Sequence, residues 1–153
     1  MRFLLIDRIT TWEPGRAATA TKNVSLSEDF FEDHFPEKPI MPGVLMLEGM
    51  AQLAGMLLEE SARQASGLRV KALLSLVERA KFRSPVYPGE QIEYRVTLLA
   101  RNEEGGKVGA VAWCQGEERA ECTLVFSFQR FENERLERRQ QQVMAVWMRG
   151  LRC

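Results

Sequence analysis

The sequence predicts an α+β fold in which a long central helix is wrapped by an antiparallel β-sheet. Residues 43–63 are apolar around almost the whole helical circumference, as expected of a helix that is buried on most sides. After Gly67 the apolar residues recur at every second position, which is typical of strands with one face in a core. With 153 residues and no internal repeat, the chain suits a single core.

The segment before the central helix is expected to be mostly loop. Pro14-Gly15 marks a turn, residues 16–26 are rich enough in Ala, Thr and Val to form a strand, and Ser27 is a candidate cap for a short helical turn. Three prolines then prevent a continuous helix until Gly43: Pro36, Pro39 and Pro42. The central helix is therefore expected to begin at Gly43.

Beyond the helix, four strands are expected, at residues 70–77, 91–99, 107–114 and 119–129. Turns separate the last three strands: Glu104-Gly105-Gly106 and Gln115-Gly116-Glu117. The composition changes at Glu132, where strong helix formers begin and an apolar stripe follows: Leu136, Val143, Trp147 and Leu151. We therefore expect a domain over residues 1–131 and a C-terminal amphipathic helical extension over 132–153, outside the main core.

Composition and charge argue against several classes of protein. The 21 basic and 21 acidic residues cancel, which disfavours a nucleic-acid partner. The longest apolar stretch, residues 39–58, contains Pro42 and Glu48, so a buried helix is favoured over a membrane span. The apolar patch near the N-terminus is too short for a signal peptide. Three cysteines without metal-ligand spacing indicate free thiols in a reducing cytoplasm: Cys114, Cys122 and Cys153.

The residues best suited to chemistry lie at the start of the central helix. His34 is the only histidine, in a Pro-rich loop, and Glu48 lies among apolar neighbours inside the helix. An imidazole can accept a proton near neutral pH. The N–H of Gly43, at a helix N-terminus, can stabilise negative charge on a thioester carbonyl. A carboxyl group kept neutral by apolar surroundings can protonate a leaving hydroxyl.

Together these groups suit elimination of water from a 3-hydroxyacyl thioester. The alternative interpretation is that His34 only packs in its loop and that Glu48 is solvated or paired. A buried acid without a partner is costly, so Glu48 calls for a functional reason.

A resemblance to a known family supports the catalytic interpretation. His34-Phe35-Pro36, then Pro39, then Met41-Pro42-Gly43-Val44-Leu45, with Glu48, Met50, Ala51 and Gln52, resembles the active-site motif of 3-hydroxyacyl-acyl-carrier-protein dehydratases of the FabZ type. Residues 80–86 and 88–90 resemble the family's KFRxPVxPGD stretch, and residues 5–9 resemble its opening. The likeness extends from about residue 4 to residue 128.

The resemblance implies a hot-dog fold, in which the sheet wraps the long helix. It implies homodimers, often assembled into hexamers as trimers of dimers. The base His34 of one chain would then face the acid Glu48 of the other. Gly43, Val44 and Gln52 would contact the substrate, with Gln52 also orienting Glu48.

An apolar tunnel beside the helix is implied for the acyl chain, and its candidate lining is Met46, Met50 and Leu53. No metal or cofactor is implied.

The family's partner is an acyl carrier protein that bears its acyl chain on phosphopantetheine. Arg79, Lys81 and Arg83 alternate near a strand end and are candidates for docking this acidic protein. An ordinary solvated strand face is the alternative for these three residues.

Two rival functions stay open at this point. A hot-dog acyl thioesterase would hydrolyse the ester, although the presence of both a base and an acid favours dehydration. A non-catalytic carrier-binding subunit of a dehydratase complex is the other rival. Asp33 stands where the family commonly has Gly, and Leu73 about where it has an aromatic gate residue; these two departures leave room for this second possibility.

Overall fold

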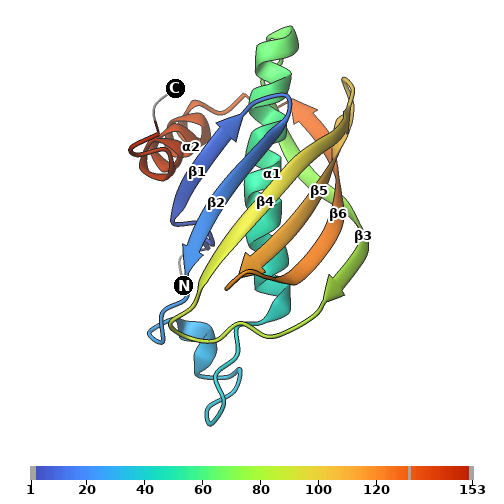
Figure 1. The fold of residues 1–153 in the computed structure, drawn as a ribbon. Coiled ribbons are helices and arrows are strands. Elements are labelled where there is room, and N and C mark those ends of the chain that lie inside the picture. The colour runs from blue at the N-terminus through green and yellow to red at the C-terminus, as the bar shows by residue number, and fades with distance from the viewer. Residues whose placement is uncertain (1–2, 131, 152–153) are drawn as a thin grey trace.

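The computed structural model describes residues 3–130 and 132–151. A 24-residue helix, α1 (Gly43–Ser66), lies against one face of a six-stranded antiparallel sheet, and Figure 1 shows the strands wrapping across it. In chain order the strands are β1 (Arg8–Glu13), β2 (Ala17–Asn23), β3 (Val70–Phe82), β4 (Gln91–Arg101), β5 (Gly105–Cys114) and β6 (Glu117–Arg130). Their order in the sheet is β1-β2-β4-β5-β6-β3. This is the predicted α+β architecture.

The boundaries of α1 follow from local chemistry. Pro42 precedes the first turn, where its missing N–H costs no helical hydrogen bond. Gly67 ends the helix in the left-handed conformation at φ 67°, and its N–H donates to the Arg63 carbonyl at 2.9 Å.

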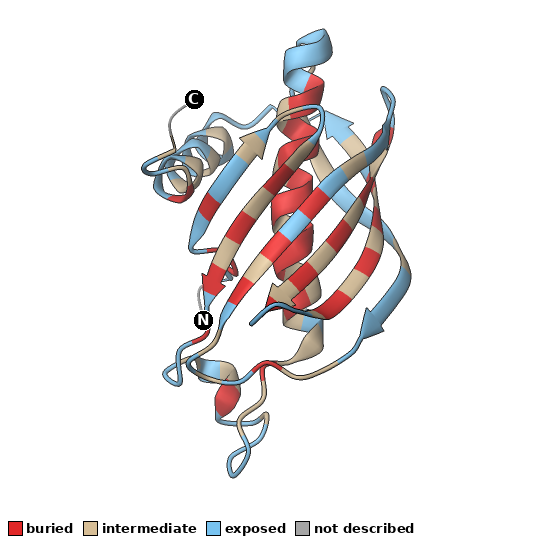
Figure 2. Ribbon diagram, viewed as in Figure 1, coloured by how far each residue is buried: buried red, intermediate tan, exposed pale blue. Residues whose placement is uncertain are grey.

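The core lies between α1 and the sheet. The inner face of the sheet alternates buried and less buried residues, as on β4, where Ile92, Tyr94 and Val96 point inward. Figure 2 shows a continuous buried band along α1 beneath these strands. Cys114 and Cys122 are buried free thiols in this core, and Cys153 lies outside the described residues.

Two expectations for the first forty residues were wrong. β1 was expected to be loop, and it was missed because Ile9 is its one fully buried residue, too weak a pattern to indicate a strand. Ser27 does not cap the short 3-10 helix η1 (Asp29–Phe31). The cap position belongs to Glu28, and the Ser27 hydroxyl pairs with Ser25 instead.

A second helix, α2 (Glu134–Trp147), lies beside β1, at the opposite edge of the sheet from β3 (Figure 1). Asn133 caps it by accepting from the N–H groups of Arg135 and Leu136. The stripe residue Trp147 is only 4% exposed and joins the core, contrary to the expectation that this segment stays outside it.

Glu59, near the end of α1, ties α2 to the rest of the fold. One carboxylate oxygen accepts from the Ala72 N–H at 2.9 Å and pairs with Lys71 at 3.1 Å. The other accepts from Gln140 of α2.

No helix in the described part of the chain is long and apolar enough to cross a membrane.

Candidate active site

The loop that carries His34 lies at the same end of the molecule as the first turn of α1 (Figure 1). It is closed by its own backbone: the His34 N–H donates to Phe30 at 3.1 Å, and the His34 carbonyl accepts from Ile40 at 2.9 Å. The His34–Phe35 peptide is cis, and the two rings stack with centroids 4.3 Å apart.

The side chain of His34 is oriented by a second bond to Ile40. Its Nδ1 lies 2.7 Å from the Ile40 carbonyl oxygen. A carbonyl can only accept, so Nδ1 carries the proton. In the neutral ring the lone pair is then on Nε2, the nitrogen that remains available to accept a proton. Half-burial of the ring leaves room for a ligand to reach it.

A set of contacts from distant strands supports this loop. The Met41 N–H donates to the Val86 carbonyl at 2.9 Å. The preceding Pro85 carbonyl accepts from the buried Arg119 of β6 at 2.7 Å. Sequence reasoning missed Arg119, because nothing in the local pattern of β6 distinguishes it from a solvated arginine.

Gly43 opens α1 with an N–H that has no acceptor among the described residues. Its lack of a side chain has a steric reason in this fold. A Cβ at Gly43 would lie 2.8 Å from the Phe82 ring, so the glycine accommodates the close approach of β3. The N–H group itself stays available at the positive end of the helix.

Glu48 is half-buried, less than its apolar neighbours in the sequence predicted, and it contacts Gln52, the residue expected to orient it. Its Oε1 accepts from Gln52 Nε2 at 3.2 Å, one turn further along α1. Their spacing of four residues puts both on one face of the helix. Val44, on the first turn, is 67% exposed.

The predicted base and acid do not bond to each other within this chain, because His34 bonds Ile40 and Glu48 bonds Gln52. The candidate tunnel residues lie elsewhere, in the core between α1 and the sheet: Met46, Met50 and Leu53. A single chain therefore places His34 and the start of α1 at the same end of the molecule and leaves Glu48 and Gln52 only partly buried.

The three candidate docking residues lie on β3 and just beyond it, and all are exposed. Lys81 pairs with Glu121 at 3.7 Å, and Arg83 pairs with Glu118 at 2.9 Å and with Glu121 at 2.8 Å. Arg79 makes no ion pair with another described residue and has an unusual φ of 52°, at an irregularity in the pairing of β3 with β6. The positive charge of Lys81 and Arg83 is thus partly compensated.

Architecture and sequence both define the class of this protein. A family-wide sequence profile described as the FabA-like domain matches residues 1–123, so the chain belongs to the FabA-like family. Within it, the chain is similar to 3-hydroxyacyl-acyl-carrier-protein dehydratases FabZ. It is 46% identical to that of Thermus thermophilus over 128 residues, 83% of this chain and 87% of the relative. It is 39% identical to that of Oleidesulfovibrio alaskensis over 122 residues, 80% and 79% of the two chains.

Solved structures share the fold at low identity. The dehydratase heterocomplex ApeI:P from Xenorhabdus doucetiae matches with a TM-score of 0.68 and 14% identity, over 90% of each chain. A hypothetical thioesterase from Streptococcus pneumoniae with coenzyme A matches with a TM-score of 0.63 and 8% identity, over 82% of this chain and 88% of the other. The fold is therefore the hot-dog fold, as predicted.

Proposed function

We propose that this protein removes water from (3R)-3-hydroxyacyl thioesters carried on acyl carrier protein, giving the trans-2-enoyl product, in fatty acid or related acyl-chain biosynthesis. The observation that carries the proposal is the bond from His34 Nδ1 to the Ile40 carbonyl, which leaves Nε2 of the neutral ring free as a base. Similarity to the FabZ dehydratases over most of the chain supports the choice of reaction.

The reaction divides among three groups. His34 Nε2 takes the proton from C2, next to the thioester carbonyl. The Gly43 N–H donates a hydrogen bond to that carbonyl and stabilises the enolate-like charge. The carboxyl group of Glu48 gives its proton to the hydroxyl on C3 as the C–O bond breaks, so water leaves and the C2–C3 double bond forms.

A second copy of the chain is proposed to complete each site. β3 is an edge strand of 13 residues, and its exposed side chains are unusually apolar: Leu73, Leu74, Leu76 and Phe82. Figure 2 shows much of this strand as exposed. An open apolar edge favours pairing with another strand. Two-fold pairing along β3 brings the His34 of one protomer toward the Glu48 face of its partner, and hexamers arise as trimers of such dimers.

The substrate is proposed to arrive on acyl carrier protein, in the cytoplasm. Arg79 is the docking residue that we favour most among the three, because Lys81 and Arg83 already pair with acids on β6. The free thiols of Cys114 and Cys122 are consistent with a reducing compartment. Residues 132–153 are proposed to be an extension of the family domain, whose profile match ends at residue 123.

The test is a direct assay of the purified protein. Enoyl thioester formation from 3-hydroxyacyl carrier protein is followed by the absorbance of the conjugated product. The reverse reaction, hydration of the enoyl thioester, is measured as a check. We expect His34→Ala and Glu48→Gln each to lower kcat by about 100-fold or more, as for loss of a general acid or base. Full activity in His34→Ala would contradict the assignment.

The same assay separates the rivals. Release of free thiol without enoyl product would indicate a thioesterase. Binding of carrier protein without turnover, until a partner subunit is added, would indicate a non-catalytic subunit.

A further inference from the structure

The side-chain amide of Gln52 is held at both ends by the main chain of the N-terminal segment. Its Oε1 accepts from the Leu5 N–H at 3.0 Å, and its Nε2 donates to the Phe3 carbonyl at 2.9 Å. The same Nε2 donates its other hydrogen to Glu48 at 3.2 Å. An N–H donor at one end and a carbonyl acceptor at the other fix the orientation of the amide, so the NH₂ group must face Glu48.

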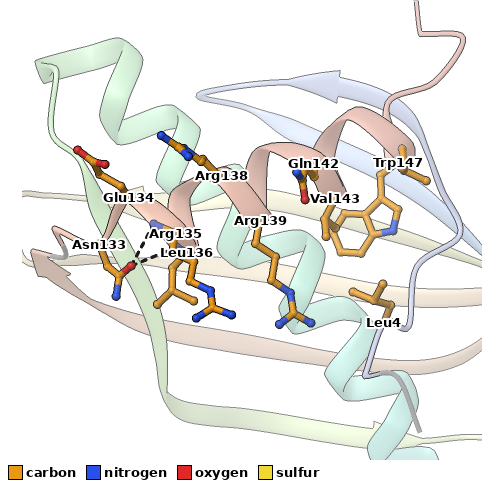
Figure 3. Close-up of a pocket in the computed structure, with 11 residues that line it drawn as sticks. Leu4, Asn133, Glu134, Arg135, Leu136, Arg138, Arg139, Gln142, Val143 and Trp147 are labelled. Carbon is orange, nitrogen blue, oxygen red and sulfur yellow. Dashed lines mark hydrogen bonds between the residues drawn. The ribbon is translucent and has the colours of Figure 1, made fainter.

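The N-terminal segment precedes β1 and has no strand pairing of its own at residues 3–5. Leu5 is buried, whereas Leu4 is 37% exposed. Figure 3 shows the Leu4 side chain pointing toward the indole of Trp147 on α2. Both residues line a groove of about 1180 Å³ between α2 and this segment, together with Val143. Leu4, the residue between the two main-chain partners of Gln52, therefore faces α2 across this groove.

We propose that α2, through Leu4 and the main chain of Phe3 and Leu5, positions the proton donor Glu48 by fixing the amide of Gln52. This inference rests on the proposed dehydration, because it assigns to Gln52 and Leu4 the task of holding the acid of that reaction. Neither residue touches the reacting atoms through this path, so both are positioning residues.

The physical argument is one of distance. A proton donor must come within hydrogen-bond reach of the leaving hydroxyl, and a displacement of about 1 Å can cost about 100-fold in rate. Glu48 is half-buried on an open face of α1, and the bond from Gln52 is the constraint on its carboxylate within the described chain. Loosening Leu4 should therefore lower kcat more than it changes KM, because Glu48 acts on the hydroxyl and not on the acyl chain.

The test is a double-mutant cycle on the full-length chain, with kcat and KM measured for Leu4→Ala, Gln52→Ala and the double variant. We expect a drop in kcat of about fivefold for Leu4→Ala and about 30-fold for Gln52→Ala, each with KM within about twofold. In the Gln52→Ala background, Leu4→Ala should have almost no further effect on kcat. Multiplicative losses in the double variant would overturn the proposal, as would an unchanged kcat in Leu4→Ala.

Further variants keep the test decisive. Gln52→Glu retains the shape of the side chain and loses the amide donor, so it should reproduce Gln52→Ala if the alanine variant folds poorly. Leu4→Met keeps an apolar side chain against Trp147 and should restore kcat. Trp147→Ala should lower kcat only in chains that keep both Leu4 and Gln52. Gln141→Ala, at an exposed position of the same helix outside this groove, should leave kcat unchanged.

Failure of this inference is distinguishable from failure of the proposed function. If His34→Ala and Glu48→Gln abolish dehydration while the cycle is multiplicative, the reaction stands and the positioning path does not. If those two variants retain activity, the reaction itself is wrongly assigned.

Discussion

At the scale of single residues, Tyr94 has the most unusual environment. Its ring packs against α1 at Gly49, where a Cβ would lie only 2.4 Å from the hydroxyl, so a glycine next to the candidate acid is required by the tyrosine. The Tyr94 hydroxyl is buried without a hydrogen-bond partner among the described residues. Burial, and secondarily the charge of Asp7, raises the pKa of Tyr94 well above its ordinary value.

Tyr94→Phe should therefore stabilise the protein. Removing a buried hydroxyl without a partner should raise the free energy of unfolding by about 1 kcal/mol at neutral pH. In the wild type this hydroxyl loses its hydrogen bonds to water on folding and gains none in return. The measurement is chemical denaturation followed by circular dichroism. A loss of stability would indicate that the hydroxyl has a partner, such as a bound water.

The same variant changes the pH dependence. A phenol with a raised folded-state pKa binds its proton more tightly in the folded protein, so stability falls as pH rises above the ordinary tyrosine value of about 10. Tyr94→Phe removes this contribution, so its unfolding free energy should decline less steeply above that pH than that of the wild type.

At the scale of elements, the attachment of α2 depends on a buried carboxylate. Glu59 is 8% exposed and bonds to β3 and to α2 at once. Glu60, next in the chain, pairs only locally, with Arg63 and Gln64. These neighbours differ in surroundings and not in chemistry, which makes them a matched pair.

We expect Glu59→Ala to lower the free energy of unfolding by about 2–3 kcal/mol, because it leaves the Ala72 N–H and the Gln140 amide without their acceptor. Glu60→Ala should cost about 0.5 kcal/mol or less, as is usual for a surface ion pair. Thermal and urea unfolding give both values. Equal losses of unfolding free energy in the two variants would contradict the role of Glu59 in attaching α2.

The elements differ in how well the sequence predicts them. The central helix was predictable because it has a continuous apolar pattern with clear terminators, Pro42 and Gly67. β3 was predicted to end at residue 77, five residues before its actual end at Phe82, because its last part is an exposed edge with charged residues. The role of Ile40 could not be predicted, since a main-chain carbonyl leaves no trace in the sequence. Arg119 acts on Pro85 across 34 positions, a contact that only the folded sheet creates.

At the scale of the whole molecule, the central question is whether one chain can complete a site. His34 and Glu48 each bond within their own segments and not to each other. Under the proposed reaction, a second chain would bring the base of one protomer to the acid of the other, as the resemblance of the motif implies. A shared site makes a quantitative prediction about mixed subunits.

Co-expression of His34→Ala and Glu48→Gln chains with different tags should restore activity that neither variant has alone. In a dimer with two-fold shared sites, random pairing gives half mixed dimers, each with one intact site, so about a quarter of wild-type activity is expected. The quarter applies to the unfractionated mixture; mixed dimers purified through both tags should show about half of wild-type activity, because one of their two sites is intact. The readout for both samples is enoyl formation. Absence of activity in the mixed dimers would show that each chain carries its own complete site.

The placement of α2 has a consequence for how far assembly can proceed. β1 and β3 are the two outer strands of the sheet, and α2 lies beside β1 (Figure 1). On β3, α2 bonds Lys71 near the start of the strand, whereas most apolar residues from Leu73 to Phe82 are exposed. A protomer with one open edge strand and one covered edge strand can pair only once, whereas a protomer with two open edge strands can add further subunits without limit. If subunits pair through β3, α2 beside β1 would stop the sheet from growing at its other edge, which would favour a closed pair of subunits over an open-ended fibre.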